Sequence, residues 1–145
     1  MTATFKVLSL LLTYPTEALR TAGSELKAAL DDEGLIPPPE RTALDALIDD
    51  LETRDLVDLQ ERYVLLFDRT RSLSLHLFEH IHGESRDRGQ AMADLMTLYE
   101  DHGLKIDKRE LPDFLPMFLE FLATLPRDHA LEFLDQPLHV IAAIE

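Results

Sequence analysis

The residues best suited to chemistry lie between positions 76 and 92, in the segment H-L-F-E-H-I-H-G-E-S-R-D-R-G-Q-A-M. His76, His80 and His82, three of the six histidines of the chain, fall within it. Together with Glu79, the first two form an H-x-x-E-H pattern, and on a helix these positions share one face. Two imidazoles on that face can ligate zinc, while the glutamate acts as general base. We find no second motif that supplies a third ligand, and the polar face of an ordinary helix remains the alternative.

Two arginines follow the histidines. Arg86 and Arg88 come directly after Ser85, which is a favourable N-cap residue for a helix. The helix macrodipole disfavours cations in the first turn, so these side chains need carboxylate partners or an external anionic ligand. The candidate partners are Asp87, Glu84 and Glu79.

Two apolar clusters lie outside this segment. Tyr63 and Phe67 are one helical turn apart in Y-V-L-L-F, which is usually a core pattern. The segment E-L-P-D-F-L-P begins at Glu110 and leads into a stretch that is apolar on nearly every side. Such a helix either lies at the centre of a core or lines a groove for an apolar partner segment.

Composition excludes several classes of protein. The chain has 145 residues, 46% of them apolar, and 28 acidic against 14 basic side chains. This acidic balance argues against nucleic-acid binding and favours a basic partner. The absence of cysteine excludes disulfides and thiol nucleophiles. No apolar run approaches the roughly 20 residues that a membrane-spanning helix needs, so we expect a soluble, cytoplasmic protein without direct membrane insertion.

Helical periodicity extends over almost the whole chain and predicts an all-α bundle, a single domain over residues 1–145, with about eight helical segments. We expect Thr16, Thr53 and Ser85 to cap helices, Gly34, Gly83 and Gly103 to end them, and residues 37–39 to form an extended connector. The expected segments cover 4–13, 16–34, the stretch from Leu44 to Leu51, that from Thr53 to Phe67, the histidines up to Gly83, Ser85 to Gly103, Pro112 to Leu125, and the stretches after Pro126 and Pro137.

Taken together, these motifs are recognisable. The segment 76–92, followed by E-L-P-D-F-L-P and L-E-F-L, resembles the NarJ family, the assembly chaperones of respiratory nitrate reductase. L-L-x-Y-P at 11–15 and Y-x-x-L-F at 63–67 resemble the same family and the wider group of redox-enzyme maturation chaperones. The resemblance extends from about residue 5 to about residue 125.

The resemblance implies a TorD/NarJ-like helical fold without catalytic residues. Such chaperones bind the N-terminal segment of the apo catalytic (alpha) subunit in the cytoplasm, until the molybdenum cofactor and an iron–sulfur cluster have been inserted and membrane docking is permitted. The molybdenum cofactor is thus handled through the partner, and no cofactor is expected to be bound stably. Family members usually continue further, so we expect a C-terminally truncated chain. Guanine-nucleotide binding and the oligomeric state remain open.

We therefore formulate a hypothesis for a peptide-binding surface. Apolar contacts are assigned to Tyr63, Phe67, Phe114, Met117 and Phe118. Basic groups of the peptide are assigned to Glu79, Asp87 and Asp113. The residues assigned to shape the site or to contact polar backbone are His76, His80, His82, Arg86 and Arg88.

Overall fold

The computed structural model describes residues 2–81, 86–106 and 109–144. Over these ranges it is all-helical, as predicted, and contains no β-strand beyond one isolated bridge. The helices are α1 (Ala3–Leu11), α2 (Glu17–Arg20), α3 (Gly23–Glu33), α4 (Pro38–Thr53), α5 (Leu56–Tyr63), a π-helical turn η1 (Val64–Asp68), a 3₁₀ turn η2 (Arg71–Leu73), α6 (Leu77–Ile81), α7 (Asp87–Asp101), α8 (Leu115–Ala123), α9 (Arg127–Asp135) and α10 (Leu138–Ala143).

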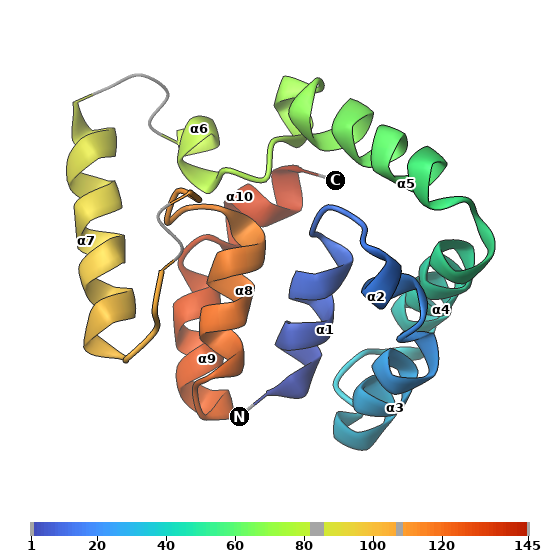
Figure 1. Ribbon diagram of the computed structural model, residues 1–145. Helices are drawn as coiled ribbons and strands as arrows, with labels where there is room; N and C mark the ends of the chain where they lie inside the picture. Colours follow the sequence, from blue (N-terminus) through green and yellow to red (C-terminus); the bar gives the residue numbers. More distant parts are fainter. Residues whose placement is uncertain (1, 82–85, 107–108, 145) are drawn as a thin grey trace.

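The central element is α1, which packs against α8 on one side and α3 on the other (Figure 1). Two hydrophobic clusters meet at this helix. Phe5 belongs to the C-terminal cluster, which is built mainly from α8 and includes Tyr99 of α7 and Ala130 of α9. Val7 belongs to the N-terminal cluster, formed with α2, α3, α4 and α5. Because successive apolar residues of α1 serve different clusters, this helix joins the two halves of the molecule.

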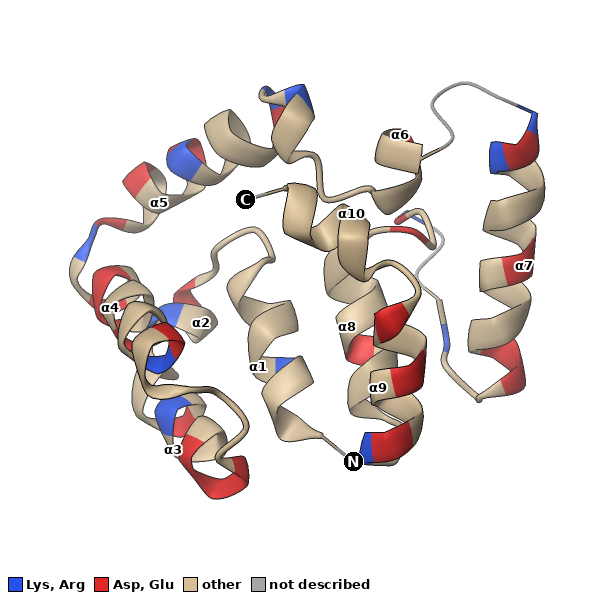
Figure 2. Ribbon diagram, turned by 180° about the vertical axis from the view of Figure 1, so that it is seen from behind, with Lys and Arg blue, Asp and Glu red and all other residues tan. Residues whose placement is uncertain are grey.

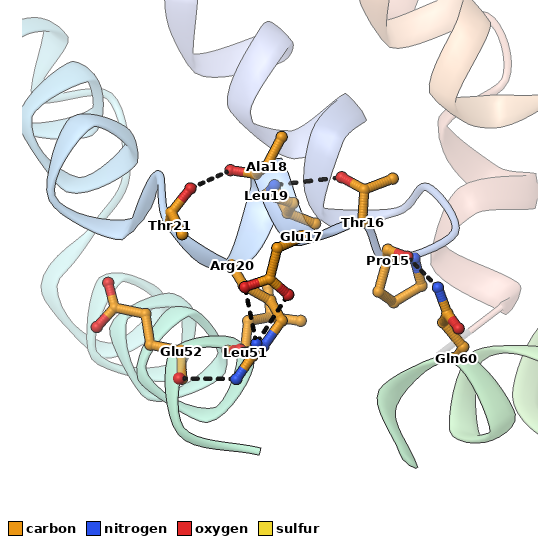
Figure 3. Close-up of polar contacts among 10 residues, drawn as sticks. All are labelled: Pro15, Thr16, Glu17, Ala18, Leu19, Arg20, Thr21, Leu51, Glu52 and Gln60. Atoms are coloured by element: carbon orange, nitrogen blue, oxygen red, sulfur yellow. Dashed lines mark hydrogen bonds and ion pairs between the residues drawn. The ribbon is translucent and has the colours of Figure 1, made fainter. Parts of the chain in front are cut away.

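Several predicted helix ends are confirmed. Thr16 Oγ1 accepts a hydrogen bond of 3.2 Å from the backbone N–H of Leu19, as expected of an N-cap (Figure 3). Gly34 follows α3 with φ of 60°, and Gly103 lies just after α7 with φ of 78°. Both are in the left-handed region, which glycine adopts without steric cost.

The helix expected over 16–34 is divided in two, so this prediction was wrong in detail. The reason is the nearby end of α4. The guanidinium group of Arg20 donates to the backbone carbonyls of Leu51 and Glu52, at 3.2 and 3.4 Å (Figure 3). These contacts use carbonyls at the C-terminal end of α4, where intrahelical partners are lacking. Gly23 begins α3 where an added Cβ would collide with the side chain of Glu52.

The expected extended connector at 37–39 was also wrong in extent. Only Pro37 is extended, with ψ of 153°, and Pro38 begins α4. Proline is tolerated in the first turn of a helix because the N–H groups there have no intrahelical acceptor. Thr53 is the last residue of α4 and not a cap, since Asp55 holds the N-cap position of α5.

The apolar helix expected from Pro112 begins three residues later, at Leu115, with Pro116 in its first turn. Pro112 instead lies in the irregular segment before α8, and its carbonyl accepts a 2.8 Å hydrogen bond from Tyr99 Oη. This irregular segment leaves backbone groups available to residues 75–78. Helix α8 is central to the core, with six of its residues buried.

Charged residues are concentrated on the outer helices. Acidic residues are spread over α3, α4, α7 and α9, whereas α1 and α8 contain almost no charged residues (Figure 2). The apolar face of α7 is only partly buried. Tyr99 is fully buried, but Met92, Leu95 and Met96 are half-buried.

Candidate functional site

The histidine segment does not form the helix that the H-x-x-E-H pattern requires. Helix α6 (Leu77–Ile81) begins after His76, which is part of an isolated antiparallel bridge to Phe114. His76, Glu79 and His80 therefore do not share one helical face, and that expectation was wrong. The residues around 113 provide hydrogen-bond partners that interrupt the helix at this point.

Those partners form a compact connection that we call the His76–Asp113 junction, comprising residues 74–78 and 112–115. Asp113 is fully buried, and its carboxylate accepts a 2.9 Å hydrogen bond from the backbone N–H of Phe78. Its other oxygen lies 3.3 Å from Nδ1 of His76. Backbone bonds complete the junction, from Leu77 N–H to the Asp113 carbonyl at 3.1 Å and from Leu115 N–H to the Leu75 carbonyl at 2.7 Å.

The junction also affects the pKa of His76 and the position of the ring proton of the nearby His80. The hydrogen bond from His76 to Asp113 raises the pKa of His76, against the lowering effect of burial, with further support from the charges of Glu79 and Glu110. His80 Nε2 lies 2.8 Å from the backbone carbonyl of Ser74. A carbonyl only accepts, so Nε2 of His80 carries the proton and is not available as a metal ligand in this arrangement.

The zinc alternative therefore loses its geometric basis. Within residues 2–81, 86–106 and 109–144, no group of three or more His, Asp or Glu side chains is arranged to hold a metal ion. His82, the third histidine of the segment, lies outside the described residues, as do Gly83, Glu84 and Ser85.

The two arginines lie at the start of α7. Arg86 occupies the N-cap position and is exposed, and Asp87 in the first turn is also exposed. Arg88 Nη2 lies 4.0 Å from Glu79 Oε1, so one of the expected carboxylate partners is present at the limit of ion-pair distance. This contact connects α6 to α7 across the four residues that are not described.

A groove of about 880 Å³ opens beside the junction. It is lined by α1, the α1–α2 loop and α2, by Tyr63 of α5 and Asp68 of η1, and by α8 with the segment before it. Its lining is mostly apolar, with Leu10, Tyr14, Leu104, Phe114 and Met117 among the contributors. Charged residues at its edge are Asp68, Glu110, Glu120, Lys105 and His76.

Tyr63 is the best-fixed side chain of this groove. Its hydroxyl donates a 2.9 Å hydrogen bond to the carbonyl of Leu12, and its ring contacts Tyr14 edge-on and Phe67 at centroid distances of 5.7 and 5.0 Å. Burial raises the pKa of Tyr63, and the nearby carboxylates of Asp68 and Glu110 raise it further. The phenol thus stays neutral, and the negative charges of Asp68 and Glu110 both reach this end of the groove.

The structure brings together only part of the hypothesised peptide-binding set. Tyr63, His76, Phe114 and Met117 line the groove. Phe114 stacks against the His76 ring at a centroid distance of 5.2 Å, so the junction directly supports this wall. Eight of the other residues do not line the groove. They are the buried Asp113 and Phe118, the half-buried Phe67, His80 and Arg88, and the exposed Glu79, Arg86 and Asp87.

Sequence reasoning missed several groove residues. Tyr14, Asp68, Lys105 and Glu120 were not in the hypothesised set, although Tyr14 lies in the L-L-x-Y-P element. These residues come from segments more than 100 positions apart, and each is unremarkable among its neighbours in the chain. Glu110 was the one detectable member, because it stands directly before a proline-rich helix start.

No helix in the described part of the chain has both the length and the apolar character to cross a lipid bilayer.

Comparison with known proteins agrees with the resemblance. A family model for the nitrate reductase delta subunit matches residues 16–143. The nitrate reductase molybdenum cofactor assembly chaperone NarJ of Escherichia coli K12 is 47% identical over 138 residues, which are 95% of this chain and 58% of that protein. The probable chaperone NarW of the same strain is 42% identical over 96% of this chain and 57% of its own length.

A more distant relative is the probable assembly chaperone NarJ of Bacillus subtilis 168, which is 34% identical over 83% of this chain and 64% of its own length. The chain thus spans less than two thirds of each of these relatives. The family match nevertheless covers most of the chain, including α8 and the whole of the junction. The chain belongs to the nitrate reductase delta subunit family.

Proposed function

We propose that this protein is a cytoplasmic chaperone of nitrate reductase assembly, which binds the N-terminal segment of the apo catalytic subunit. It would hold that subunit while the molybdenum cofactor is inserted and before the enzyme docks at the membrane. The observation that carries the proposal is the 47% identity to an assembly chaperone over 95% of the chain. The molybdenum cofactor is cargo for the partner in this scheme, and we assign no residue of this chain to it.

The groove is the surface best suited to the peptide. Its volume of about 880 Å³ falls in the usual range of binding clefts, and its lining combines apolar side chains with a few charged ones. Half-buried Phe114 and Met117 can receive an apolar side chain of the peptide. Methionine suits this role because its flexible thioether adapts to different shapes.

The charged edge of the groove favours a basic partner segment. Asp68 and Glu110 are exposed and lie close enough to Tyr63 to raise its pKa. A lysine or arginine of the bound peptide placed there would be attracted by both carboxylates. The overall charge of −14 favours encounter with such a segment over long range.

This geometry changes the roles that we assigned from the sequence. Asp113 is buried with hydrogen bonds to His76 and Phe78, so we now assign it to positioning the groove wall rather than to contact with the peptide. Phe67 and Phe118 support the wall from the core side. The residues proposed for direct contact are Tyr63, His76, Phe114, Met117, Asp68 and Glu110.

Calorimetric titration with a synthetic peptide of the reductase's N-terminal segment tests the proposal. We expect wild-type binding in a one-to-one complex. Met117→Ala should weaken it by about tenfold, because the apolar contact area shrinks by several methylene groups. Glu110→Gln should weaken it by roughly threefold at low salt, with a smaller effect as salt screens the charge.

Matched controls lie on α9, away from the groove. Leu131→Ala removes an exposed apolar side chain, and Glu132→Gln removes an exposed carboxylate. Both should bind the peptide as the wild type does. The proposal fails if the wild-type protein does not bind the peptide. Equal affinities for the groove variants and the controls would place the binding surface elsewhere.

A further inference from the structure

A second hollow, of about 480 Å³, lies against the outer face of α5 and η1. Three exposed apolar side chains are among its lining residues. Tyr14, Val57 and Leu65 all line it, and their exposed fractions are 49%, 55% and 59%. Isolated exposed apolar side chains are common, but three of them in one concave place are typical of an interaction surface.

The second hollow adjoins the groove at Tyr14. Tyr14 lines both, and it stands between them with its ring against Tyr63. The π-helical turn η1 also serves both, because Val64 and Leu65 line the second hollow while Asp68 lines the groove. π-helical turns are rare and are often found at functional sites.

The loop that carries Tyr14 is held in place at the boundary between the two. Gln60 of α5 donates a 2.9 Å hydrogen bond to the carbonyl of Pro15 (Figure 3). Tyr63 Oη donates to the carbonyl of Leu12, just before the loop. Two hydrogen bonds from α5 thus flank Tyr14, which reduces the conformational entropy that this loop would lose on binding.

We infer that the groove and the second hollow form one extended binding surface for a single amphipathic segment of the reductase subunit. One apolar residue of that segment enters the groove at Met117, a basic residue meets Asp68 and Glu110, and a second apolar residue passes Tyr14 to contact Val57 and Leu65. The basic group is placed between the two apolar ones because Asp68 and Glu110 both act on Tyr63, whose ring contacts Tyr14, the residue that lines both hollows. The inference rests on the proposed function, since it names the chemistry of the segment that the groove receives.

The charge arrangement supports this occupant over a second copy of the chain. Both hollows have carboxylates in their lining, Asp68 and Glu110 in the groove and Glu61 in the second hollow. Among the described residues, Arg69 is the one basic side chain that lines the second hollow. A second copy with a net charge of −14 would bring further carboxylates to these positions, whereas a basic amphipathic segment would neutralise them.

The test is a double-mutant cycle between the protein and a synthetic N-terminal segment of the reductase subunit. The protein variant is Val57→Ser with Leu65→Ser, at positions too exposed to affect folding. The peptide variants each replace one apolar anchor with serine. We expect the doubly substituted protein to bind the unsubstituted peptide about tenfold more weakly than the wild-type protein does. For the peptide that lacks the anchor for the second hollow, the two proteins should have the same affinity.

Leu131→Ser with Leu138→Ser is the matched control, since these leucines are exposed by 47% and 48% on α9 and α10. It should leave affinity unchanged. Met117→Ala should weaken binding of the peptide that keeps only its groove anchor. Circular dichroism and a thermal unfolding scan confirm that each variant is folded.

The outcomes separate this inference from the proposed function. If Met117→Ala weakens binding but the Val57, Leu65 double variant does not, the groove receives the peptide and the extension is wrong. If the wild-type protein binds no peptide, the proposed function itself fails. Sedimentation velocity completes the test, because a dimer that dissociates only in the Val57, Leu65 double variant would assign the second hollow to another copy of the chain and overturn the inference.

Discussion

Polar side chains have opposite surroundings at the His76–Asp113 junction and at the groove beside it. At the junction, the carboxylate of Asp113 is fully buried, and both its oxygens have partners within the chain. At the groove, Asp68 and Glu110 are exposed and line an opening whose walls are mostly apolar. Buried polar groups contribute to stability when they are satisfied, while exposed ones are available to a partner. Substitutions should therefore separate stability from binding.

The two regions nevertheless share a wall. His76 and Phe114 belong to the junction and also line the groove, where their rings stack. The junction thus fixes the position of a surface that the peptide is proposed to contact. A loss of junction contacts should reduce stability first and affect affinity only through displacement of this wall.

The largest effect is expected from Asp113→Ala. The substitution removes a fully buried carboxylate and leaves the partly buried backbone N–H of Phe78 and Nδ1 of His76 without this acceptor. Because a buried group that loses a charged partner incurs most of its desolvation cost, we expect the free energy of unfolding to fall by about 3 kcal/mol. Urea unfolding followed by circular dichroism measures this change.

Glu132→Ala on α9 removes the same charge from an exposed position and should change the free energy of unfolding by less than about 0.5 kcal/mol. Asp113→Asn provides a second comparison, since an amide oxygen can still accept from the N–H of Phe78. It should lie between the wild type and Asp113→Ala. A stability of Asp113→Ala equal to that of the control would show that the junction does not contribute to the fold.

The fold was largely predictable because its information is local. Helical periodicity, Thr16 as a cap and Gly34 and Gly103 as helix ends depend on residues a few positions apart. The errors arose where distant contacts decide the conformation. Arg20 ends α2 against the carbonyls of α4, and Asp113 holds His76 out of the helix that its own neighbours favour. No local pattern contains these partners.

The site was less predictable for the same reason. The histidine segment stands out because unusual side chains are concentrated in it, yet His76 and His80 are engaged with Asp113 and Ser74 of the chain itself. The groove is built from α1, η1 and α8, which bring together ordinary residues such as Leu10, Asp68 and Met117. Concentrated polar residues thus identified the region but not the open surface beside it.

A smaller effect is expected at His76, in the form of a pH dependence. The pKa of His76 is raised in the folded state, chiefly by the hydrogen bond to Asp113, so the protonated form stabilises the fold. This contribution is fully present below the unfolded pKa of about 6.5 and is lost as pH rises through the higher folded pKa. The difference in unfolding free energy between wild type and His76→Gln should therefore be larger at about pH 5.5 than at about pH 8.5.

Urea unfolding of both proteins at the two pH values gives this difference directly. His129→Gln, at an exposed position of α9, controls for the loss of a surface histidine. When the same comparison is made in the Asp113→Asn background, the extra stabilisation at low pH should shrink, because the main cause of the raised His76 pKa is gone and only the charges of Glu79 and Glu110 remain. A difference that is the same at both pH values would mean that the His76–Asp113 pair does not change its charge state on folding.

The smallest effect is expected from Lys6→Gln, and it should appear in binding more than in stability. Lys6 Nζ lies 3.0 Å from Glu120 Oε1, and both side chains are about half exposed, at 47% and 48%. Such surface ion pairs contribute little, so the free energy of unfolding should change by less than about 0.5 kcal/mol. Glu120 also lines the groove, and loss of its partner leaves one more uncompensated carboxylate facing a basic peptide. Affinity should therefore rise by roughly twofold at low salt and return to the wild-type value near 1 M salt, where screening is strong.

Lys27→Gln breaks the ion pair with Asp49, away from the groove, and should leave affinity unchanged in the same calorimetric titration. If the two lysine variants behave alike, Glu120 does not face the bound peptide, and the acidic edge of the groove reduces to Asp68 and Glu110.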